Sequence, residues 1–241
     1  MSDAPGAPPS ASGGPAPGAS PPAPEGPAPG DSRGLPGRLA GAGFAVDELG
    51  EGAWTALREA FVPGHEALLE RLAATLPLRA EALRIAGREV MTPRRTSFHG
   101  DPGGAYRYSG RSFEPLPLTP ELEALRGALA ALTGHRFNAV LVNHYRDGGD
   151  AMGWHADDEP ELGPNAPDDV LIASVSLGAP RRFVLRHRRR PAERREHWLG
   201  GGSLLVMGGT TQRRWQHALP RTARPVGGRM NLTYRIVRAA R

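Results

Sequence analysis

The sequence of 241 residues contains no cysteine and no lysine. The absence of cysteine excludes disulfide bonds and thiolate metal sites, so any bound metal must be held by histidine, aspartate or glutamate. All 30 basic residues are therefore arginine, and the formal net charge is only +5. The distribution of the arginines along the chain is more informative than this modest total.

Long apolar runs are absent as well. No stretch of about eighteen apolar residues occurs, and the first residues lack the apolar segment of a signal peptide. Residues 1–38 are almost entirely Ala, Pro, Gly and Ser, and such a segment buries too little apolar surface to offset its ordering entropy. We expect a disordered tail there, one domain over residues 39–241, and a monomeric cytoplasmic protein without membrane contact.

Helices are expected mainly before the middle of the chain. Gly50–Pro77 carries apolar residues at helical spacing, beginning with Trp54, and predicts one or two amphipathic helices. The segment LTPELEALRGALAALTG predicts the clearest helix, with Thr119 as its N-cap and Gly134 as its end.

Short strands dominate the rest of the chain. The region Leu83–Tyr108 reads as strands broken by glycines. Seven further strands are expected at Phe137–Arg146, Val170–Gly178, Arg182–His187, Arg195–Leu199, Ser203–Met207, Arg214–Leu219 and Arg229–Val237. Because no βαβ rhythm is visible, we expect an α+β, mainly β protein with an antiparallel jelly-roll core at about 137–238 and N-terminal supporting helices.

A pair of metal-ligand types stands in MGWHADDEPE, where His155 and Asp157 are two residues apart and face one way on an extended segment. Three downstream histidines could complete a site. His187 lies among arginines that would repel a cation, His197 reads as solvated, and His217 lies on a predicted strand, so we favour His217. Two histidines and one carboxylate are typical of non-haem Fe(II) oxygenases. An ordinary polar loop or a calcium loop are the alternatives, although no regular calcium-loop spacing is present.

The stretch GGRMNLTYRIVR predicts a strand with two unlike faces. Arg229, Asn231 and Arg235 share one face because side chains alternate along a strand, and the other face is apolar. Paired arginines suit a buried dicarboxylate, which they can bind through charge-assisted, bidentate hydrogen bonds. A second arginine group, Arg181–Arg195, contains eight arginines and one acid, and predicts either a polyanion contact or a solvated hairpin.

These pieces together resemble the AlkB family of Fe(II)- and 2-oxoglutarate-dependent dioxygenases, which dealkylate nucleic acids. The resemblance is carried by NHYRDGGDAMGWHADDE, by His217 in GGSLLVMGGTTQRRWQHALP and by RMNLTYR, in this order. It runs from about Pro93, through PRRTSFHGDPGGAYRYSG and IASVSLGAPRRFVLRH, to the end of the chain. Within the family the sequence resembles the subgroup that contains the human DNA repair homologues.

The resemblance implies roles for individual residues. Fe(II) would be bound by His155, Asp157 and His217, with 2-oxoglutarate and O₂ as co-substrates. The 2-oxoglutarate contacts would be Asn143, Tyr145, Arg229, Asn231 and Arg235. Arg229 would bind the distal carboxylate and Arg235 would lie near the carboxylate that chelates iron, although which arginine takes which end stays open. Strand periodicity independently places Asn143 and Tyr145 on one face.

The resemblance also implies a substrate side. Glu159 would contact the damaged base, Tyr106 and Tyr108 would lie near the flipped base on substrate-lid strands at about 83–115, and Arg94 would lie near the nucleic acid. Candidate phosphate contacts are Arg182, Arg188 and Arg189. A strand aromatic in the core is the alternative for either tyrosine, and a solvated acid is the alternative for Glu159.

The implied function is oxidative demethylation of N1-methyladenine and N3-methylcytosine in DNA, with release of formaldehyde, succinate and CO₂. Such bases pair poorly, which lowers the cost of flipping them out of a duplex. They are also cationic, which suits a carboxylate beside them. The alternatives are the same chemistry on RNA, a protein or a small molecule, and a non-catalytic jelly roll that binds a metal or an anion.

Overall fold

The computed structural model describes residues 32–80, 82–85, 88–102, 106–108, 111–162 and 165–238. Two antiparallel sheets form its centre, as expected for a jelly roll. The larger sheet has the strand order β1 (Ala45–Gly50), β2 (Ala53–Arg58), β13 (Leu204–Gly209), β10 (Ile172–Gly178), β15 (Arg229–Arg235), β8 (Ala139–Tyr145), β5 (Arg95–Gly100). The smaller sheet has the order β12 (Arg194–Leu199), β11 (Arg181–His187), β14 (Trp215–Leu219), β9 (Met152–His155).

Two small hairpins lie outside these sheets. Strand β3 (Ala82–Ile85) pairs with β4 (Arg88–Met91), and β6 (Tyr106–Tyr108) pairs with β7 (Arg111–Phe113). They fall in the region where we expected lid strands, and their backbones confirm short strands there. The residues between the strands of each hairpin lie outside the described part of the chain.

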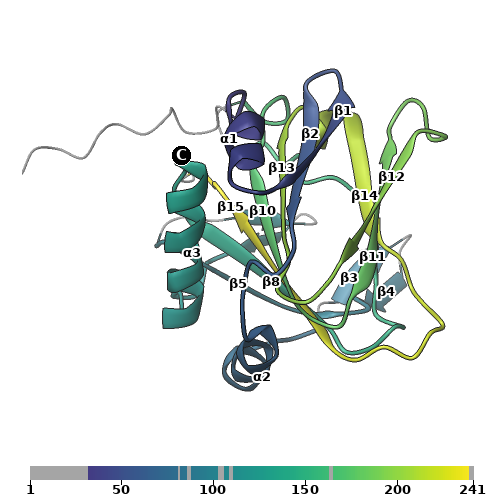
Figure 1. Cartoon of the computed structure of the whole chain (residues 1–241). Helices are drawn as coiled ribbons and strands as arrows, with labels where there is room; N and C mark the ends of the chain where they lie inside the picture. Colours follow the sequence, from purple (N-terminus) through teal and green to yellow (C-terminus); the bar gives the residue numbers. More distant parts are fainter. Residues whose placement is uncertain are drawn as a thin grey trace, which may run out of the picture.

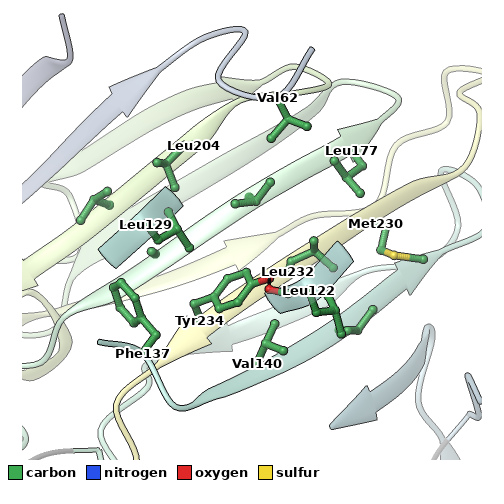
Figure 2. Close-up of a cluster of buried hydrophobic side chains, with 14 of the residues drawn as sticks. Val62, Leu122, Leu129, Phe137, Val140, Leu177, Leu204, Met230, Leu232 and Tyr234 are labelled. Carbon is green, nitrogen blue, oxygen red and sulfur yellow. Dashed lines mark hydrogen bonds between the residues drawn. The ribbon is translucent and has the colours of Figure 1, made fainter. Parts of the chain in front are cut away.

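Three helices cover one face of the larger sheet (Figure 1). They are α1 (Leu35–Gly41), α2 (His65–Thr75) and α3 (Pro120–Thr133). Leu39, Leu72 and Leu129 are fully buried in the apolar cluster between helices and sheet. The interior strand β15 contributes Met230, Leu232 and Tyr234 to the same cluster, which Figure 2 shows in close-up. The predicted supporting helices are therefore confirmed as a layer that buries the apolar face of the sheet.

The opposite face of the larger sheet turns toward the smaller sheet. A second apolar cluster fills part of the space between them, including Ile172, Leu185 and Trp215, each almost fully buried. The polar side chains of β15 point into the remaining space, because alternation along a strand sends them away from the helices. This division of β15 places the candidate site in the interior of the jelly roll.

Helix α3 confirms its predicted ends. The side chain of Thr119 accepts a hydrogen bond from the backbone N–H of Leu122, and Pro120 occupies the first helical position. Gly134 ends the helix with φ of 76°, a left-handed conformation that glycine adopts without strain. The seven predicted strands after this helix are also confirmed, each within two residues at its ends.

The prediction for Gly50–Pro77 was wrong in its first half. Residues 53–58 form β2, which pairs with β1 and with β13, and the helix α2 occupies only His65–Thr75. Ala53, Trp54 and Ala56 are buried because β2 lies inside the sheet with both faces covered. A strand buried on both faces lacks alternation, so its apolar residues happened to match a helical spacing.

The predicted start of the domain was too late. Ser32 is fully buried and its hydroxyl donates to Asp169 over 2.6 Å, while the N–H of Gly209 donates to that same hydroxyl. Leu35 and Leu39, four residues apart on α1, pack into the main apolar cluster. The domain therefore includes residues 32–38, which their proline and glycine content had assigned to the tail, and residues 1–31 lie outside the described part.

One further finding concerns membranes. Among the described residues, none of the helices combines the length and the apolar character that a membrane-crossing helix requires.

Candidate metal and co-substrate site

Two histidines face each other across the smaller sheet. His155 ends β9 and His217 lies on β14, where the two residues are direct partners in the antiparallel register. Their ring centroids are 4.2 Å apart. Asp157 follows two residues after His155, and one ligand atom from each of the three lies within 4.8 Å of the others. The structure thus brings together the three residues that the sequence singled out.

The protonation states of these residues suit metal binding. Burial lowers the pKa of His217 to about 3, and the neighbouring His155 acts in the same direction. Burial also lowers the pKa of His155, so both rings are neutral at neutral pH and keep a lone pair for a metal. The Nδ1 atom of His155 lies 2.8 Å from the carbonyl oxygen of Gly153, which makes Nδ1 the donor and leaves Nε2 as the ligand atom.

Asp157 is held so that one oxygen stays available. Arg235 donates from Nη2 to Oδ1 of Asp157 over 2.5 Å, and both side chains are almost fully buried. The other oxygen, Oδ2, lies 3.9 Å from Nε2 of His217. Burial opposes ionisation of Asp157, but the pKa of Asp157 is nevertheless lowered, chiefly by the charge of Arg235. The carboxylate is therefore charged and presents a single oxygen toward the histidines.

This donor set fits Fe(II). Two neutral imidazoles and one carboxylate would bind a metal ion from one side, which leaves its other coordination positions free for ligands that are not protein. The calcium alternative rested on the acids of residues 147–161, and among the described residues these acids do not form a metal-ligand group of their own.

A cavity opens beside the three residues, between the two sheets. Its empty space is about 600 Å³, counting the part that opens to solvent. The wall combines side chains from both sheets and the adjoining segments: Arg94, Leu141, Asn143, Tyr145, Met152, His155, Asp157, Ser174, Phe183, Leu199, Met207, His217, Leu219, Arg229, Asn231, Thr233 and Arg235. All five residues that the resemblance assigned to 2-oxoglutarate therefore lie in one wall.

Arg229 is a buried cation, and only part of its guanidinium group makes hydrogen bonds. It is 1% exposed, and it donates from Nη1 to the carbonyl oxygen of Leu199 and from Nη2 to Oγ of Ser176. Its Nε is also buried and makes no hydrogen bond within the described part of the chain. Burial lowers the pKa of Arg229 to about 10, so the group stays cationic at neutral pH. A buried cation with a free donor in a cavity wall suits a carboxylate ligand.

The rest of this wall comes from paired strands. Asn231 on β15 is the register partner of Asn143 on β8, and Arg229 is the partner of Tyr145. Asn231 accepts a hydrogen bond from Ser174 at Oδ1 over 2.8 Å. This network orients the amide of Asn231, and it arises because three neighbouring strands present their polar faces to the same cavity.

Arg94 lies deeper than the sequence indicated. The resemblance placed it near the nucleic acid, but it is 3% exposed and donates from Nε to Oδ1 of Asn143 over 2.7 Å. It thus lies in the cavity wall, next to a predicted 2-oxoglutarate contact.

The substrate-side residues are less closely gathered. Glu159 is half-buried, and among the described residues it does not belong to the lining of the cavity. Tyr106 and Tyr108 lie on β6, and their side chains fall outside the described part of the structure. The structure therefore does not place a base-binding pocket.

The candidate phosphate contacts are spread over the smaller sheet and its hairpin. Arg182 lies on β11, 3.7 Å from Glu196, and Arg188 donates to Asp158 over 2.5 Å. Arg189 is exposed and makes no ion pair within the described part of the chain. These three residues lie on the outer surface rather than in the cavity.

Two residues of the site escaped the sequence analysis. Ser176 accepts from Arg229, and its signal was present, because Ser174 and Ser176 alternate in the otherwise apolar segment IASVSLG. Gln212 accepts a hydrogen bond from the backbone N–H of Asp157 over 3.0 Å. No local pattern marks Gln212, since its partner lies 55 residues away.

Comparison with known proteins agrees with this geometry. Residues 62–235 match the model of the 2OG-Fe(II) oxygenase superfamily. The chain is 42% identical to mouse "DNA oxidative demethylase ALKBH2" over 160 residues, which cover 64% of this chain and 65% of that protein. It is 38% identical to human "Alpha-ketoglutarate-dependent dioxygenase alkB homolog 3", over 70% of this chain and 60% of that protein.

Two further matches extend the comparison. The "DNA oxidative demethylase ALKBH2" of Arabidopsis thaliana is 34% identical over 79% of this chain and 68% of that protein. A solved structure, "The structure of OsALKBH1", superposes with a TM-score of 0.55 at 18% identity, covering 80% of this chain and all of that chain, which supports the fold alone. The matched region spans less than two thirds of the mouse, human and bovine ALKBH2 proteins.

Proposed function

This chain belongs to the AlkB family within the 2OG-Fe(II) oxygenase superfamily, and from that premise we propose that it is a DNA oxidative demethylase. Its substrates would be N1-methyladenine and N3-methylcytosine. The proposal draws on the names of the similar mouse and Arabidopsis proteins, both DNA oxidative demethylases.

One observation carries the proposal most directly. Arg229 and Arg235 are both almost fully buried on one face of β15, beside the three metal-ligand residues. Asp157 compensates the charge of Arg235, whereas Arg229 donates only to uncharged oxygens and keeps a free Nε among the described residues. A non-catalytic jelly roll would have no reason to bury such a guanidinium group next to a metal site, because desolvating a charge costs several kcal/mol unless a partner compensates it. A dicarboxylate co-substrate provides that compensation.

Once bound, Fe(II), 2-oxoglutarate and O₂ supply the oxidation, in which the 2-oxo acid becomes succinate and CO₂ and a methyl C–H bond of the base is hydroxylated. The resulting N-hydroxymethyl group loses formaldehyde without help from an acid or base residue. The work of the protein is therefore positioning, charge compensation and exclusion of water.

Each part of the chain has a role in that work. His155, Asp157 and His217 would hold Fe(II). Arg229 would bind the distal carboxylate of 2-oxoglutarate through its free Nε and the adjacent N–H groups, with Asn143, Tyr145 and Asn231 completing the contacts. Arg235 already compensates the charge of Asp157, so it would lie at the end of the co-substrate that is closer to the metal.

On the substrate side, we assign Glu159 to the cationic methylated ring, since a carboxylate there favours a charged lesion over a neutral base. Tyr106 and Tyr108 would stack on the flipped base. The arginines of the smaller sheet would contact phosphates, which position the nucleic acid without reading its sequence.

An assay with methylated oligonucleotides tests the proposal. Single-stranded DNA, duplex DNA and RNA carrying N1-methyladenine are incubated with the protein, Fe(II) and 2-oxoglutarate. We expect one succinate and one formaldehyde for each methyl group removed from DNA, and no demethylation by Asp157→Ala. Demethylation of RNA but not DNA would show that the substrate is RNA. Succinate release without any demethylation would overturn the assignment as a demethylase, although the chain would still be a 2-oxoglutarate-dependent oxygenase.

A further inference from the structure

The segment that carries Asp157 has little support from regular structure. Strand β9 ends at His155, and residues 156–159 belong to no helix or strand. Asp157 is nevertheless 2% exposed, so its backbone N–H cannot rely on water. A buried N–H outside a sheet ladder needs a partner from elsewhere in the fold.

Gln212 provides that partner. Its Oε1 accepts from the N–H of Asp157 over 3.0 Å, and its Nε2 lies 3.8 Å from the sulfur of Met207. Gln212 is fully buried. Because Met207 offers only an acceptor, the amide has one favourable orientation, with its oxygen toward Asp157.

The backbone that carries Gln212 is fixed independently of the metal ligands. Gln212 belongs to the one-turn helix α4 (Thr211–Arg214) between β13 and β14. Its neighbour Thr211 receives a hydrogen bond from the N–H of Trp54 at Oγ1, and that hydroxyl lies 2.6 Å from the carbonyl oxygen of Gly208. Helix α4 is thereby attached to β2 and β13 of the larger sheet, so Gln212 links Asp157 to the larger sheet.

We propose that Gln212 is a positioning residue for the metal site. Asp157 is held at two points, by Arg235 at Oδ1 and by Gln212 at its backbone N–H, and these two contacts leave Oδ2 facing His217. Gln212 determines where the backbone of the ligand lies, and Arg235 determines the rotation of the carboxylate. Partners of this kind, which touch the ligand and not the metal, commonly change metal affinity by about 10- to 100-fold.

The inference rests on the proposed function only in taking Fe(II) as the natural metal, so the test uses a metal alone. Metal-free protein is titrated with Mn(II), without 2-oxoglutarate or nucleic acid, and free Mn(II) is measured by electron paramagnetic resonance. We expect Gln212→Met, which keeps the volume and removes the oxygen, to weaken Mn(II) binding about 10- to 100-fold. Gln212→Glu, which keeps an acceptor oxygen, should restore at least part of that loss.

A matched control separates positioning from general stability. Thr133 is also fully buried, and its hydroxyl accepts from the backbone N–H of His135 over 3.2 Å at the end of α3, away from the cavity. Thr133→Val removes the same kind of bond. Thr133→Val should lower the melting temperature. It should leave Mn(II) affinity within about threefold of wild type, well below the roughly tenfold change expected for a residue that supports a metal ligand, because Thr133 lies away from the cavity.

A spectroscopic readout completes the test. The visible absorption of bound Co(II) reports its coordination geometry, and at saturating Co(II) the spectrum of Gln212→Met should differ from wild type while that of Thr133→Val overlays it. If Gln212→Met does not fold, Gln212→Asn, whose oxygen is one methylene too short, takes its place with the same expected result. An unchanged spectrum together with Mn(II) affinity within threefold of wild type would overturn the proposal. A failed demethylation assay would leave this result untouched.

Discussion

Two groups of arginines in this molecule differ in burial and in partners. Arg229 and Arg235 on β15 are 1% and 2% exposed and line a cavity. Most arginines of the β11–β12 hairpin are exposed, and several are paired with acids: Arg190 contacts both Glu51 and Glu193, and Arg188 contacts Asp158. Exposed pairs contribute about 0–1 kcal/mol each, whereas burying a guanidinium group costs several.

A third arginine shows that burial alone does not mark a ligand site. Arg181 is also 2% exposed, but it donates to the carbonyl oxygens of Asp147, Asp150 and Pro220, and it does not line the cavity. Arg229 differs because its Nε has no acceptor within the described part of the chain. The difference teaches that a free donor on a buried cation, and not the cation itself, indicates a missing anion.

The largest expected effect is on 2-oxoglutarate binding, and it should distinguish Arg229 from Arg181. Arg229→Met should raise the concentration of 2-oxoglutarate needed for half-maximal turnover by about 30- to 5000-fold, because truncating one partner of a buried charge pair costs about 2–5 kcal/mol. Arg181→Met should lower the melting temperature and leave that concentration within about threefold. Succinate release and thermal melts on both variants measure this, and equal loss of 2-oxoglutarate binding in both would remove the distinction between them.

As the pH falls, the metal-free protein should lose the stability contributed by the buried His217 before it loses that of Glu51 and Glu193, the acids that pair with Arg190. Burial lowers the pKa of His217 to about 3, whereas hydrogen bonds from Arg190 lower the pKa of Glu51 and of Glu193. An unfolded histidine takes up its proton near pH 6.5, so the unfolded chain gains protons first. The metal-free protein should be most stable above pH 6.5 and lose up to about 1.4 kcal/mol per pH unit for each such histidine as pH falls toward 3. Glu51 and Glu193, which pair with Arg190, lose their contribution to stability only as the pH falls below the ordinary pKa range of a carboxylate.

Thermal melts of the metal-free protein between pH 7.5 and pH 5 check this. His217→Gln should reduce the slope of melting temperature against pH, and Glu51→Gln should leave it unchanged in that window. A flat profile for wild type, or a slope that depends on Glu51, would contradict the assignment of acid sensitivity to the cavity.

The smallest expected effect is on DNA binding by the exposed arginines of the β11–β12 hairpin. Arg189 has no ion pair within the described residues, whereas Arg190 has two acidic partners. Arg189→Ala should lower the affinity for DNA modestly and reduce the slope of log Kd against log salt by about one, as expected for one lost phosphate contact. Arg190→Ala should change that slope less, because its charge is already compensated. A larger change for Arg190→Ala in the binding titrations would show that the hairpin pairs open on DNA.

Much of the interior of the site was predictable from the sequence because it follows strand periodicity. Alternation alone separates Arg229, Asn231 and Arg235 from the apolar face of β15, and it places Asn143 with Tyr145. His155 and Asp157 follow the same rule across the end of β9. The residues favoured His217 as the third ligand and the resemblance supported it, but the direct pairing of His155 with His217 depends on long-range strand register, which the sequence did not show.

What the sequence could not provide has a physical reason in each case. Strand β2 read as a helix because burial on both faces removes alternation. Arg94 and Gln212 act through contacts with Asn143 and Asp157, which lie far away in the chain and leave no local pattern. The short apolar spacing of α1 was hidden by the proline and glycine around it.

The central claim is that one iron and one 2-oxoglutarate bind together in the cavity between the sheets. Anaerobic titration of the metal-free protein with Fe(II) and then 2-oxoglutarate, followed by visible absorption, tests it directly, since a 2-oxo acid that chelates Fe(II) absorbs visible light. We expect one Fe(II) and one 2-oxoglutarate per chain, with the absorption absent from Asp157→Ala. Fe(II) binding with no absorption change on addition of 2-oxoglutarate would contradict it.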